Sequence, residues 1–357
     1  MSITVYRKPC LLLEAEELVY CLVNHIPSEQ MSGEGAFCIP ADVMEQIRQK
    51  ACAGLSPQDP ALQFYFQGIP MEGRKGRPPC LASFLLYSRL QLGTHRPEET
   101  LQVLSRAWAE TPRPFRVTDL NGFSIELSTA PAPEEFLPLS QEIGKLPIPA
   151  SAQLQIVEVL SAPQEHLQRL SAFLLPVAEE LEVQLAPWVA RAQPLADAWE
   201  NFFRTVSIDT FTQQRYHVKQ SAFCGLHLAL RYISPDCSFL VIRDPPGEVH
   251  LYASVKMEVG MGEAGESDAF GKDEFMLFRL LSNETRMAML RLLMQEELCF
   301  QDIVSTMKLN PGTVFRELNS MREYMLIQIN IIDGKQYYKA NKDTIKNIAN
   351  KLIRFAN

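Results

Sequence analysis

The sequence predicts an α+β, helix-rich fold, in which a large N-terminal α/β-mixed domain precedes a small C-terminal domain of short helices and one β-hairpin. Two observations separate the domains. Of the 24 prolines, only Pro311 lies beyond residue 271. Residues 259–273 contain four glycines, several acids and few apolar side chains, a composition typical of a linker. We therefore expect an N-terminal domain at residues 1–258, a linker at 259–273 and a C-terminal domain at 274–357.

In the N-terminal domain, apolar residues recur at helical or strand spacing along much of the chain. Pro97, followed by two glutamates, suits a helix start, because proline lacks an N–H that would be free there. The Asp-Pro-Pro-Gly segment at 244–247 suits a tight turn between two strands. The expected helices cover residues 14–25, 40–53, 80–91, 97–110, 163–186 and 188–205, and the expected strands cover 3–6, 122–128, 223–233, 237–243 and 248–257.

The composition excludes several classes of protein. The contents of hydrophobic (46%) and charged (21%) residues are ordinary for a globular protein. No segment reaches about 18 consecutive apolar residues, the length expected of a membrane span. Glu14, Glu16 and Glu17 stand where a secretory signal would be apolar. The eight cysteines form no C-x-x-C pair, so we expect reduced thiols in a cytoplasmic protein that does not contact membranes.

Charge is divided unequally between the two parts of the chain. Residues 272–357 carry 13 Lys and Arg against 10 Asp and Glu, whereas residues 1–271 carry 21 against 32. Only the C-terminal part is therefore suited to approach a polyanion, and its excess of positive charge is small.

The C-terminal domain begins with the pattern of three short helices. The segment Phe275 to Leu281 is apolar, and Asn283 suits the N-cap of a second helix. A turn at residues 308–310 follows the third helix, after which Asn310 suits an N-cap and Pro311 a first helical position. The apolar faces expected on the second and third helices consist of Met287, Leu290, Leu293 and Met294, and of Phe300, Ile303, Val304 and Met307.

The helix after Asn310 is the candidate recognition helix. Its apolar stripe is expected at Val314, Leu318, Met321 and Met325. The remaining side chains include short hydrogen-bonding groups and arginines, which can reach base edges and phosphates in a major groove. The candidate DNA-binding residues, including a lysine at the tip of the following hairpin, are Asn310, Thr313, Phe315, Arg316, Asn319, Ser320, Arg322 and Lys335.

The hairpin follows directly. Ile327, Ile329 and Ile331 alternate with polar residues, as in a half-buried strand. Asp333-Gly334 suits a two-residue turn, and Lys335 beside it is suited to contact a phosphate. A closing helix with a narrow apolar face is expected near the C-terminus. The order of these elements predicts a winged helix-turn-helix.

The motifs of this domain resemble the ArsR family of bacterial repressors. The resemblance rests on L-S-N-E-T-R-x-x-x-L-x-x-L from Leu281, the E-L-C segment ending at Cys299, the T-V-x-R-x-L helix from Thr313 and the hairpin around Asp333, and it covers roughly residues 275–341. The region up to about residue 257 is weakly similar to N-terminal domains attached to some ArsR-type regulators. The resemblance implies a DNA-binding transcription regulator that forms a homodimer and whose N-terminal domain binds an effector or mediates oligomerisation.

The sequence also departs from the family's metal sensors. These often carry a C-x-C pair, whereas here the segment is Cys299-Phe300-Gln301. One soft ligand does not hold a thiophilic ion, and residues 342–356 contain no histidine for the family's other metal site. The resemblance also implies a serine and a histidine where Phe315 and Glu317 stand, and a glutamate there would repel phosphates. We therefore expect no metal and no cofactor.

Other interpretations remain open. The winged domain could bind a protein partner instead of DNA, and the N-terminal domain could be an enzyme, although no G-x-S-x-G, phosphate-binding glycine-rich loop or H-E-x-x-H is present. The basic segment Gly73 to Pro78 is expected to be a solvated loop rather than a minor-groove hook. His217 and His227 could lie near each other but are expected to be structural. The aromatic residues around Trp199 are expected in the core, with an apolar pocket for a small-molecule effector as the alternative.

Overall fold

The computed structural model describes residues 2–356 apart from several segments. The residues not described are 71–76, 88, 94–95, 111–114, 119–123, 128–139, 141–142, 145, 147, 217, 221–222, 235–237, 244–246, 261–271 and 333–334. The expected turn at 244–247, the hairpin tip at 333–334 and most of the expected linker therefore lie wholly or mainly outside the described residues. The described part up to residue 260 is called the body, and the part from residue 272 is called the winged domain.

The body contains a mixed four-stranded sheet in the order β1-β5-β7-β6. β1 (Ser2–Tyr6) pairs in parallel with β5 (Gly225–Arg231), and β5 pairs in parallel with β7 (Glu248–Ser254). β6 (Phe239–Arg243) pairs antiparallel with β7, which confirms the two strands expected on either side of residues 244–247. A separate hairpin consists of β2 (Phe115–Thr118) and β3 (Ser124–Leu127).

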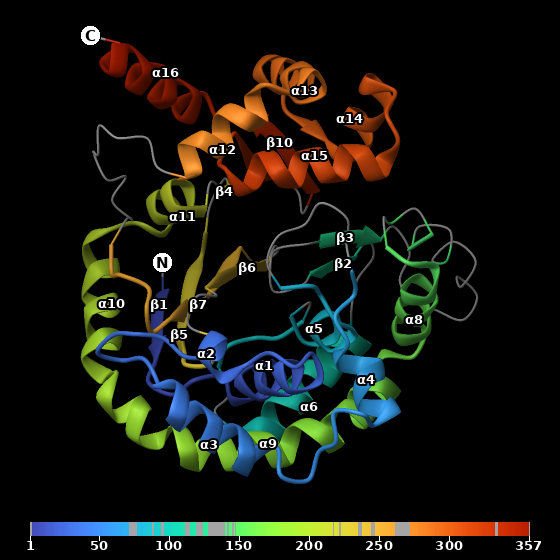
Figure 1. Ribbon diagram of the computed structural model, residues 1–357, viewed down its shortest axis with the longest axis vertical. Helices are drawn as coiled ribbons and strands as arrows, with labels where there is room; N and C mark the ends of the chain where they lie inside the picture. Colours follow the sequence, from blue (N-terminus) through green and yellow to red (C-terminus); the bar gives the residue numbers. More distant parts are fainter. Residues whose placement is uncertain are drawn as a thin grey trace.

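Most helices of the body lie on the side of this sheet away from the winged domain, whereas α11 (Ile208–Tyr216) lies beside that domain (Figure 1). The long helix α9 (Pro163–Arg191) curves around the body in Figure 1, and it contains Pro176 and Pro187, residues that bend helices by removing a backbone donor. The remaining body helices are α1 (Leu11–Val23), α2 (Ser28–Met31), α3 (Ala41–Ala51), α4 (Pro60–Phe66), α5 (Leu81–Tyr87), α6 (Pro97–Ala109), α8 (Ala150–Ser161), α10 (Gln193–Thr205) and α11 (Ile208–Tyr216).

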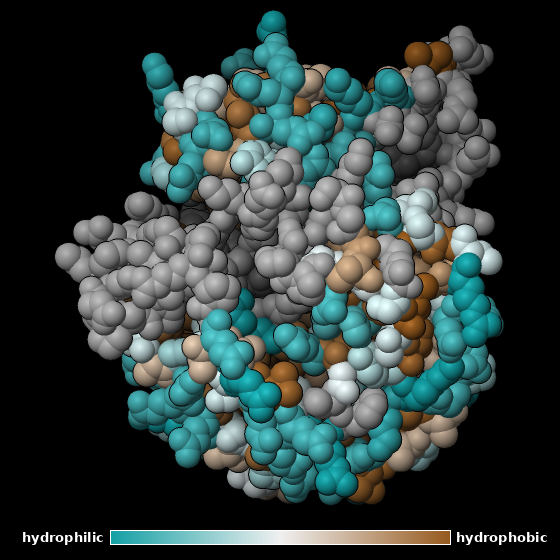
Figure 2. All heavy atoms as spheres, turned by 180° about the vertical axis from the view of Figure 1, so that it is seen from behind, coloured by the Kyte–Doolittle hydropathy of each residue, from teal (hydrophilic) through white to brown (hydrophobic). Residues whose placement is uncertain are grey.

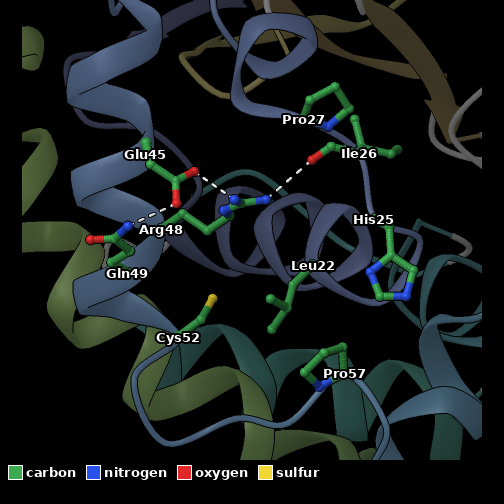
Figure 3. A pocket seen from close by; sticks show the side chains of 9 residues that line it. All are labelled: Leu22, His25, Ile26, Pro27, Glu45, Arg48, Gln49, Cys52 and Pro57. Atoms are coloured by element: carbon green, nitrogen blue, oxygen red, sulfur yellow. Dashed lines mark hydrogen bonds and ion pairs between the residues drawn. The ribbon is translucent and has the colours of Figure 1, made fainter.

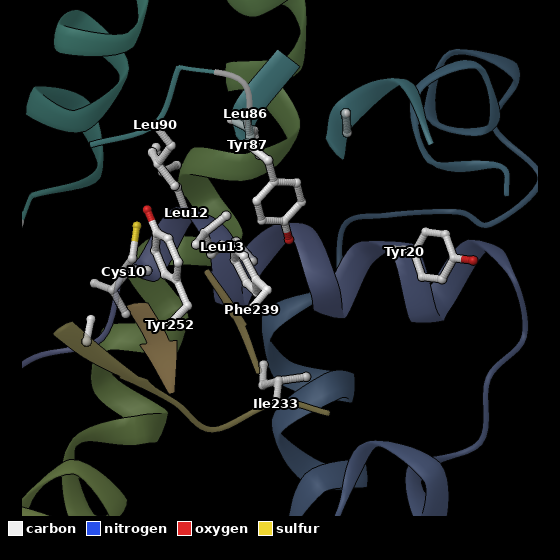
Figure 4. Packing of buried hydrophobic residues seen from close by; sticks show 14 of the residues in the cluster. Cys10, Leu12, Leu13, Tyr20, Leu86, Tyr87, Leu90, Ile233, Phe239 and Tyr252 are labelled. Carbon is white, nitrogen blue, oxygen red and sulfur yellow. The ribbon is translucent and has the colours of Figure 1, made fainter. Parts of the chain in front are cut away.

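The core of the body joins α1 to the sheet and to α5. Leu12 and Leu13 of α1 pack in one cluster with Tyr87, Phe239 and Tyr252, as Figure 4 shows. Phe239 and Tyr252 are registered partners on β6 and β7, and their rings stack with centroids 4.4 Å apart. Burial of these large side chains supplies the main favourable contribution to folding of the body.

Three glutamates of α1 are buried beside this core. Glu16 and Glu17 are 0% and 2% exposed, and the guanidinium of Arg77 bonds to both carboxylates at 2.6 Å. Arg231 bonds to Glu17 at 3.2 Å, and the backbone N–H groups of residues 232 and 233 donate to Glu14. Arg77 therefore does not lie in a solvated loop as expected, because two buried carboxylates bind its charge. Residues 73–76 lie outside the described residues.

The winged domain has a core of its own. Its helices are α12 (Lys272–Leu281), α13 (Glu284–Gln295), α14 (Phe300–Met307), α15 (Pro311–Glu323) and α16 (Lys342–Ala356), and its strands are β8 (Leu298–Cys299), β9 (Ile327–Ile332) and β10 (Lys335–Ala340). Leu293, Ile303, Leu318 and Ile327 are among its fully buried residues. The expected α+β, helix-rich fold class is confirmed. On the face shown in Figure 2, hydrophilic side chains cover most of the coloured part of this domain.

One strand of the body continues the sheet of the winged domain. β4 (Val218–Gln220) pairs in parallel with β9, which gives a sheet in the order β4-β9-β10-β8. The sequence pattern did not predict this strand. In the part of the chain that the structure describes, no helix combines the length and the apolar character needed to cross a membrane.

Candidate nucleic-acid interface

The turn between α14 and α15 fixes the direction of the candidate recognition helix. Lys308 ends α14 in the left-handed conformation, with a φ of 52°. The side chain of Asn310 accepts a hydrogen bond from the N–H of Gly312 at 2.8 Å, and Pro311 is the first helical residue. Asn283 caps α13 in the same way, by accepting from the N–H of Arg286 at 3.0 Å. Both caps confirm the expected helix starts, because each satisfies an N–H that the helix leaves free.

The apolar stripe of α15 is confirmed except at its end. Val314, Leu318 and Met321 are 0–2% exposed. Met325 is 47% exposed, because α15 ends at Glu323 and Met325 adopts a left-handed φ of 59° that reverses the chain. Leu326 is buried in the core instead. Met287 of α13 was also assigned wrongly, since it is 46% exposed while Met289 is fully buried.

The outward side of α15 is only partly open to solvent. All six candidate DNA-binding residues on the helix are half-buried. These residues are Thr313, Phe315, Arg316, Asn319, Ser320 and Arg322. None of the α15 side chains that the structure describes is exposed, whereas the neighbouring helix α14 exposes Gln301, Asp302, Ser305 and Thr306. A surface helix normally has a polar exposed face, so α15 is buried on its inner side and partly covered on its outer side.

The body provides part of this cover. Phe315 packs against the hydrophobic cluster of the body rather than that of the winged domain. In Figure 1, α15 lies along the side of the winged domain that faces the body. β4 is registered with β9 through the pairs Val218↔Ile329, Lys219↔Asn330 and Gln220↔Ile331, so the body also contacts the wing.

Two ion pairs change the electrostatics expected for this surface. Glu317 pairs with Arg286 of α13, and both side chains are largely buried, at 16% and 21% exposed. Its carboxylate is thus directed to a cation within the domain, which reduces the expected repulsion of phosphates. Lys339 of β10 bonds to Glu297 at 2.6 Å. Lys335 is the first residue of β10, beside the hairpin tip that lies outside the described residues, and Asn310 at the start of α15 is exposed.

The thiol of Cys299 stands where the resemblance implies a metal-binding pair. Its Sγ donates to the Oδ2 of Asp302 at 2.9 Å. Burial and this carboxylate raise the pKa of Cys299, which disfavours the thiolate form that metals and oxidants require.

The structure brings together two histidines that the sequence analysis did not pair. His227 and His250 are registered partners on β5 and β7, and Glu248 lies near both, with Nε2–Oε distances of 3.9 and 3.8 Å. His217 lies outside the described residues. A pairing of β5 with β7 could not be read from the spacing of the histidines, because strand order is a property of the whole sheet.

These three side chains as arranged do not suit one metal ion. The two imidazole rings stack with centroids 4.8 Å apart and 13° between their planes. A metal binds a nitrogen lone pair in the ring plane at about 2.0–2.1 Å, and two nearly parallel planes do not meet at that distance. The N–H of Leu92 also donates to Nδ1 of His250 at 3.1 Å, which places the proton of a neutral His250 on the Nε2 that faces Glu248.

The body contains a surface pocket of about 410 Å³ between the end of α1 and α3 (Figure 3). Arg48 bonds there to Glu45 at 2.5 Å and to the carbonyl oxygen of Ile26 at 3.2 Å. Gln49 and Ser28 donate to the same Glu45. Its charged groups are thus bound to one another, and the geometry does not select a ligand class.

Comparison with a family model supports the assignment of residues within the C-terminal region. Residues 283–328 match the model of the family described as bacterial regulatory protein, arsR family. A solved structure of the homodimeric winged helix-turn-helix DNA-binding domain of a possible ArsR-family transcriptional regulator from Mycobacterium bovis is 22% identical. The match covers 27% of this chain and 87% of that chain, with a TM-score of 0.22. No curated protein matches the chain.

Proposed function

From the premise that the C-terminal region is an ArsR-type helix-turn-helix, we propose that the chain is a DNA-binding transcription regulator of the cytoplasm rather than an enzyme. In this proposal α15 enters the major groove and the hairpin of β9 and β10 contacts the adjacent backbone. The body serves as an effector-binding or oligomerisation domain.

The arrangement of α14, the turn and α15 carries this proposal. The two helix caps and the buried stripe fix α15, so that Thr313, Arg316 and Asn319 lie away from the core of the winged domain. Arginine suits the acceptor edge of guanine, and asparagine suits adenine. The pairing of Glu317 with Arg286 supports it further, because one of the two glutamates on this helix is thereby neutralised within the domain.

Exposed apolar side chains on α12 and α16 support a homodimer. Phe275 is 62% exposed, and Leu352 and Ile353 are 42% and 59% exposed. In Figure 1, α16 extends away from the rest of the winged domain. Contact between these helices in two copies would bury these side chains, and a dimer would present two copies of α15 to successive major grooves.

A titration of double-stranded DNA from upstream of the protein's own gene tests the function. We expect a complex that weakens as salt rises, because phosphate contacts release counterions. Arg316→Glu should abolish it, whereas Arg291→Glu, a matched charge reversal at an exposed residue of α13, should have little effect. The proposal is refuted if neither the wild type nor variants in which α15 is freed form a salt-sensitive complex at micromolar protein concentration.

One observation favours a second candidate function. The outward side of α15 already contacts protein, since Phe315 packs against the body. A winged domain that only binds protein would require this contact and no DNA. Under that alternative, any weak DNA association of the wild type would be unchanged in both the Arg316→Glu and the Arg291→Glu variant.

A further inference from the structure

The contact between β4 and β9 joins the two parts of the chain through backbone pairing. β4 belongs to the body, because α11 ends at Tyr216 and β5 begins at Gly225 on either side of it. Phe211 anchors α11 in the body by packing on Trp199 and Phe203. β9 belongs to the winged domain, where it pairs with β10. Separation of the winged domain from the body must therefore break the β4–β9 contact.

The same arrangement covers the candidate recognition surface. Phe315 lies against the core of the body, and every α15 side chain that the structure describes is at least half-buried. The major groove is about 12 Å wide and admits a helix with its side chains but not a second layer of protein. α15 can therefore enter a groove only after the body has moved away from it.

We propose that the β4–β9 contact holds the chain in an autoinhibited state that withholds α15 from DNA, and that DNA binding requires these strands to separate. This inference rests on the proposed function. The body also holds the beginning of the linker, because the guanidinium of Arg215 on α11 donates to the carbonyl oxygens of Glu258 and Gly260. The boundary that opens is therefore β4 against β9 together with Phe315 against the body.

Proline substitutions in β4 of the full-length chain test this. The N–H groups of neighbouring residues in a strand point in opposite directions. Only one of the substitutions Lys219→Pro and Gln220→Pro therefore removes an N–H that donates a hydrogen bond to β9, and the other substitution is its matched control. We expect one of the two variants to show faster amide hydrogen exchange in β9 and α15. The same variant should bind a labelled DNA duplex from upstream of the protein's gene about tenfold more tightly. This ratio corresponds to the loss of about one backbone hydrogen bond between β4 and β9, which would otherwise hold the closed state.

A disulfide across the same strands tests the opposite perturbation. Lys219 and Asn330 are registered partners, and adjacent strands lie about 4.8 Å apart, within the Cα separation that a disulfide spans. In the oxidised Lys219→Cys/Asn330→Cys variant we expect DNA affinity to fall by about tenfold or more, and a reductant should restore it. The variants Lys219→Cys and Asn330→Cys are the controls, because each carries one of the two changes and cannot form this cross-link.

The outcomes separate the two proposals. The autoinhibition proposal is overturned, and the proposed function is left intact, if DNA affinity is equal for the wild type, both proline variants and the oxidised double-cysteine variant. Unchanged exchange of β9 and α15 in both proline variants would also overturn autoinhibition. If one proline variant frees α15 but no form of the chain binds the duplex, the proposed function is wrong and this inference fails with it.

Discussion

Replacement of Arg77 with alanine should destabilise the body strongly, because two buried carboxylates would lose their main cation. The side chain of Arg77 is 12% exposed, it bonds to Glu16 and Glu17 at 2.6 Å, and its guanidinium lies 3.7 Å from the centroid of the Tyr20 ring. Removing one partner of a buried ion pair costs about 3–5 kcal/mol. Arg7→Ala is the matched control, since Arg7 also contacts two carboxylates, those of Asp197 and Glu200, but is 42% exposed, and it should cost about 0–1 kcal/mol.

The cost of Arg77→Ala should also depend on pH. Burial alone would raise the pKa of Glu17, and Arg77 with Arg231 holds it below its ordinary value. Without Arg77, burial dominates and the folded-state pKa of Glu17 rises. A group with a raised folded-state pKa contributes stability below its unfolded pKa and loses it as pH increases. The deficit should therefore be larger at about pH 8 than at about pH 5, because it grows as pH rises above the ordinary carboxyl pKa of about 4.3 toward the raised folded-state pKa.

Urea unfolding followed by the fluorescence of Trp108 and Trp199, both buried in the body, measures these differences. Arg77→Lys should lie between the wild type and Arg77→Ala, because an ammonium keeps the charge but not the forked geometry that reaches two carboxylates. If Arg77→Ala costs no more than Arg7→Ala at both pH values, the buried ion pairs of Arg77 do not stabilise the fold.

Three further predictions concern the winged domain. Leu318→Ala should destabilise it by about 2–5 kcal/mol, since Leu318 is 2% exposed in its core, and amide hydrogen exchange of that domain would detect this. Asn310→Ala should cost about 1 kcal/mol by the same measurement, through loss of the cap to Gly312, and an unchanged exchange rate would contradict the role of the cap. Ile353→Asp should shift the proposed dimer toward monomer in sedimentation velocity, whereas the same change at exposed Leu154 of α8 should not.

The sequence predicted most helices and strands of the winged domain, because their signals are local. Asn283 and Asn310 cap helices through N–H groups two or three residues away, and both caps are present. The stripe of α15 failed only at Met325, where the chain leaves the helix with a left-handed φ that helical periodicity cannot anticipate. In the body, the strands around residues 239–254 and the helix that begins at Pro97 were predicted for the same reason.

The tertiary structure decided what depends on distant partners. The sequence showed Glu16 and Glu17 only as acids near the N-terminus, and Arg77 only as part of a basic loop, because a buried charge is stable only when a remote segment supplies its counterion. β4 is three residues long, too short for a periodic pattern, and it is ordered by pairing with β9 more than a hundred residues later. The sequence by itself thus determined the shape of the candidate recognition helix, whereas the packing of the body against it determined whether that helix is accessible.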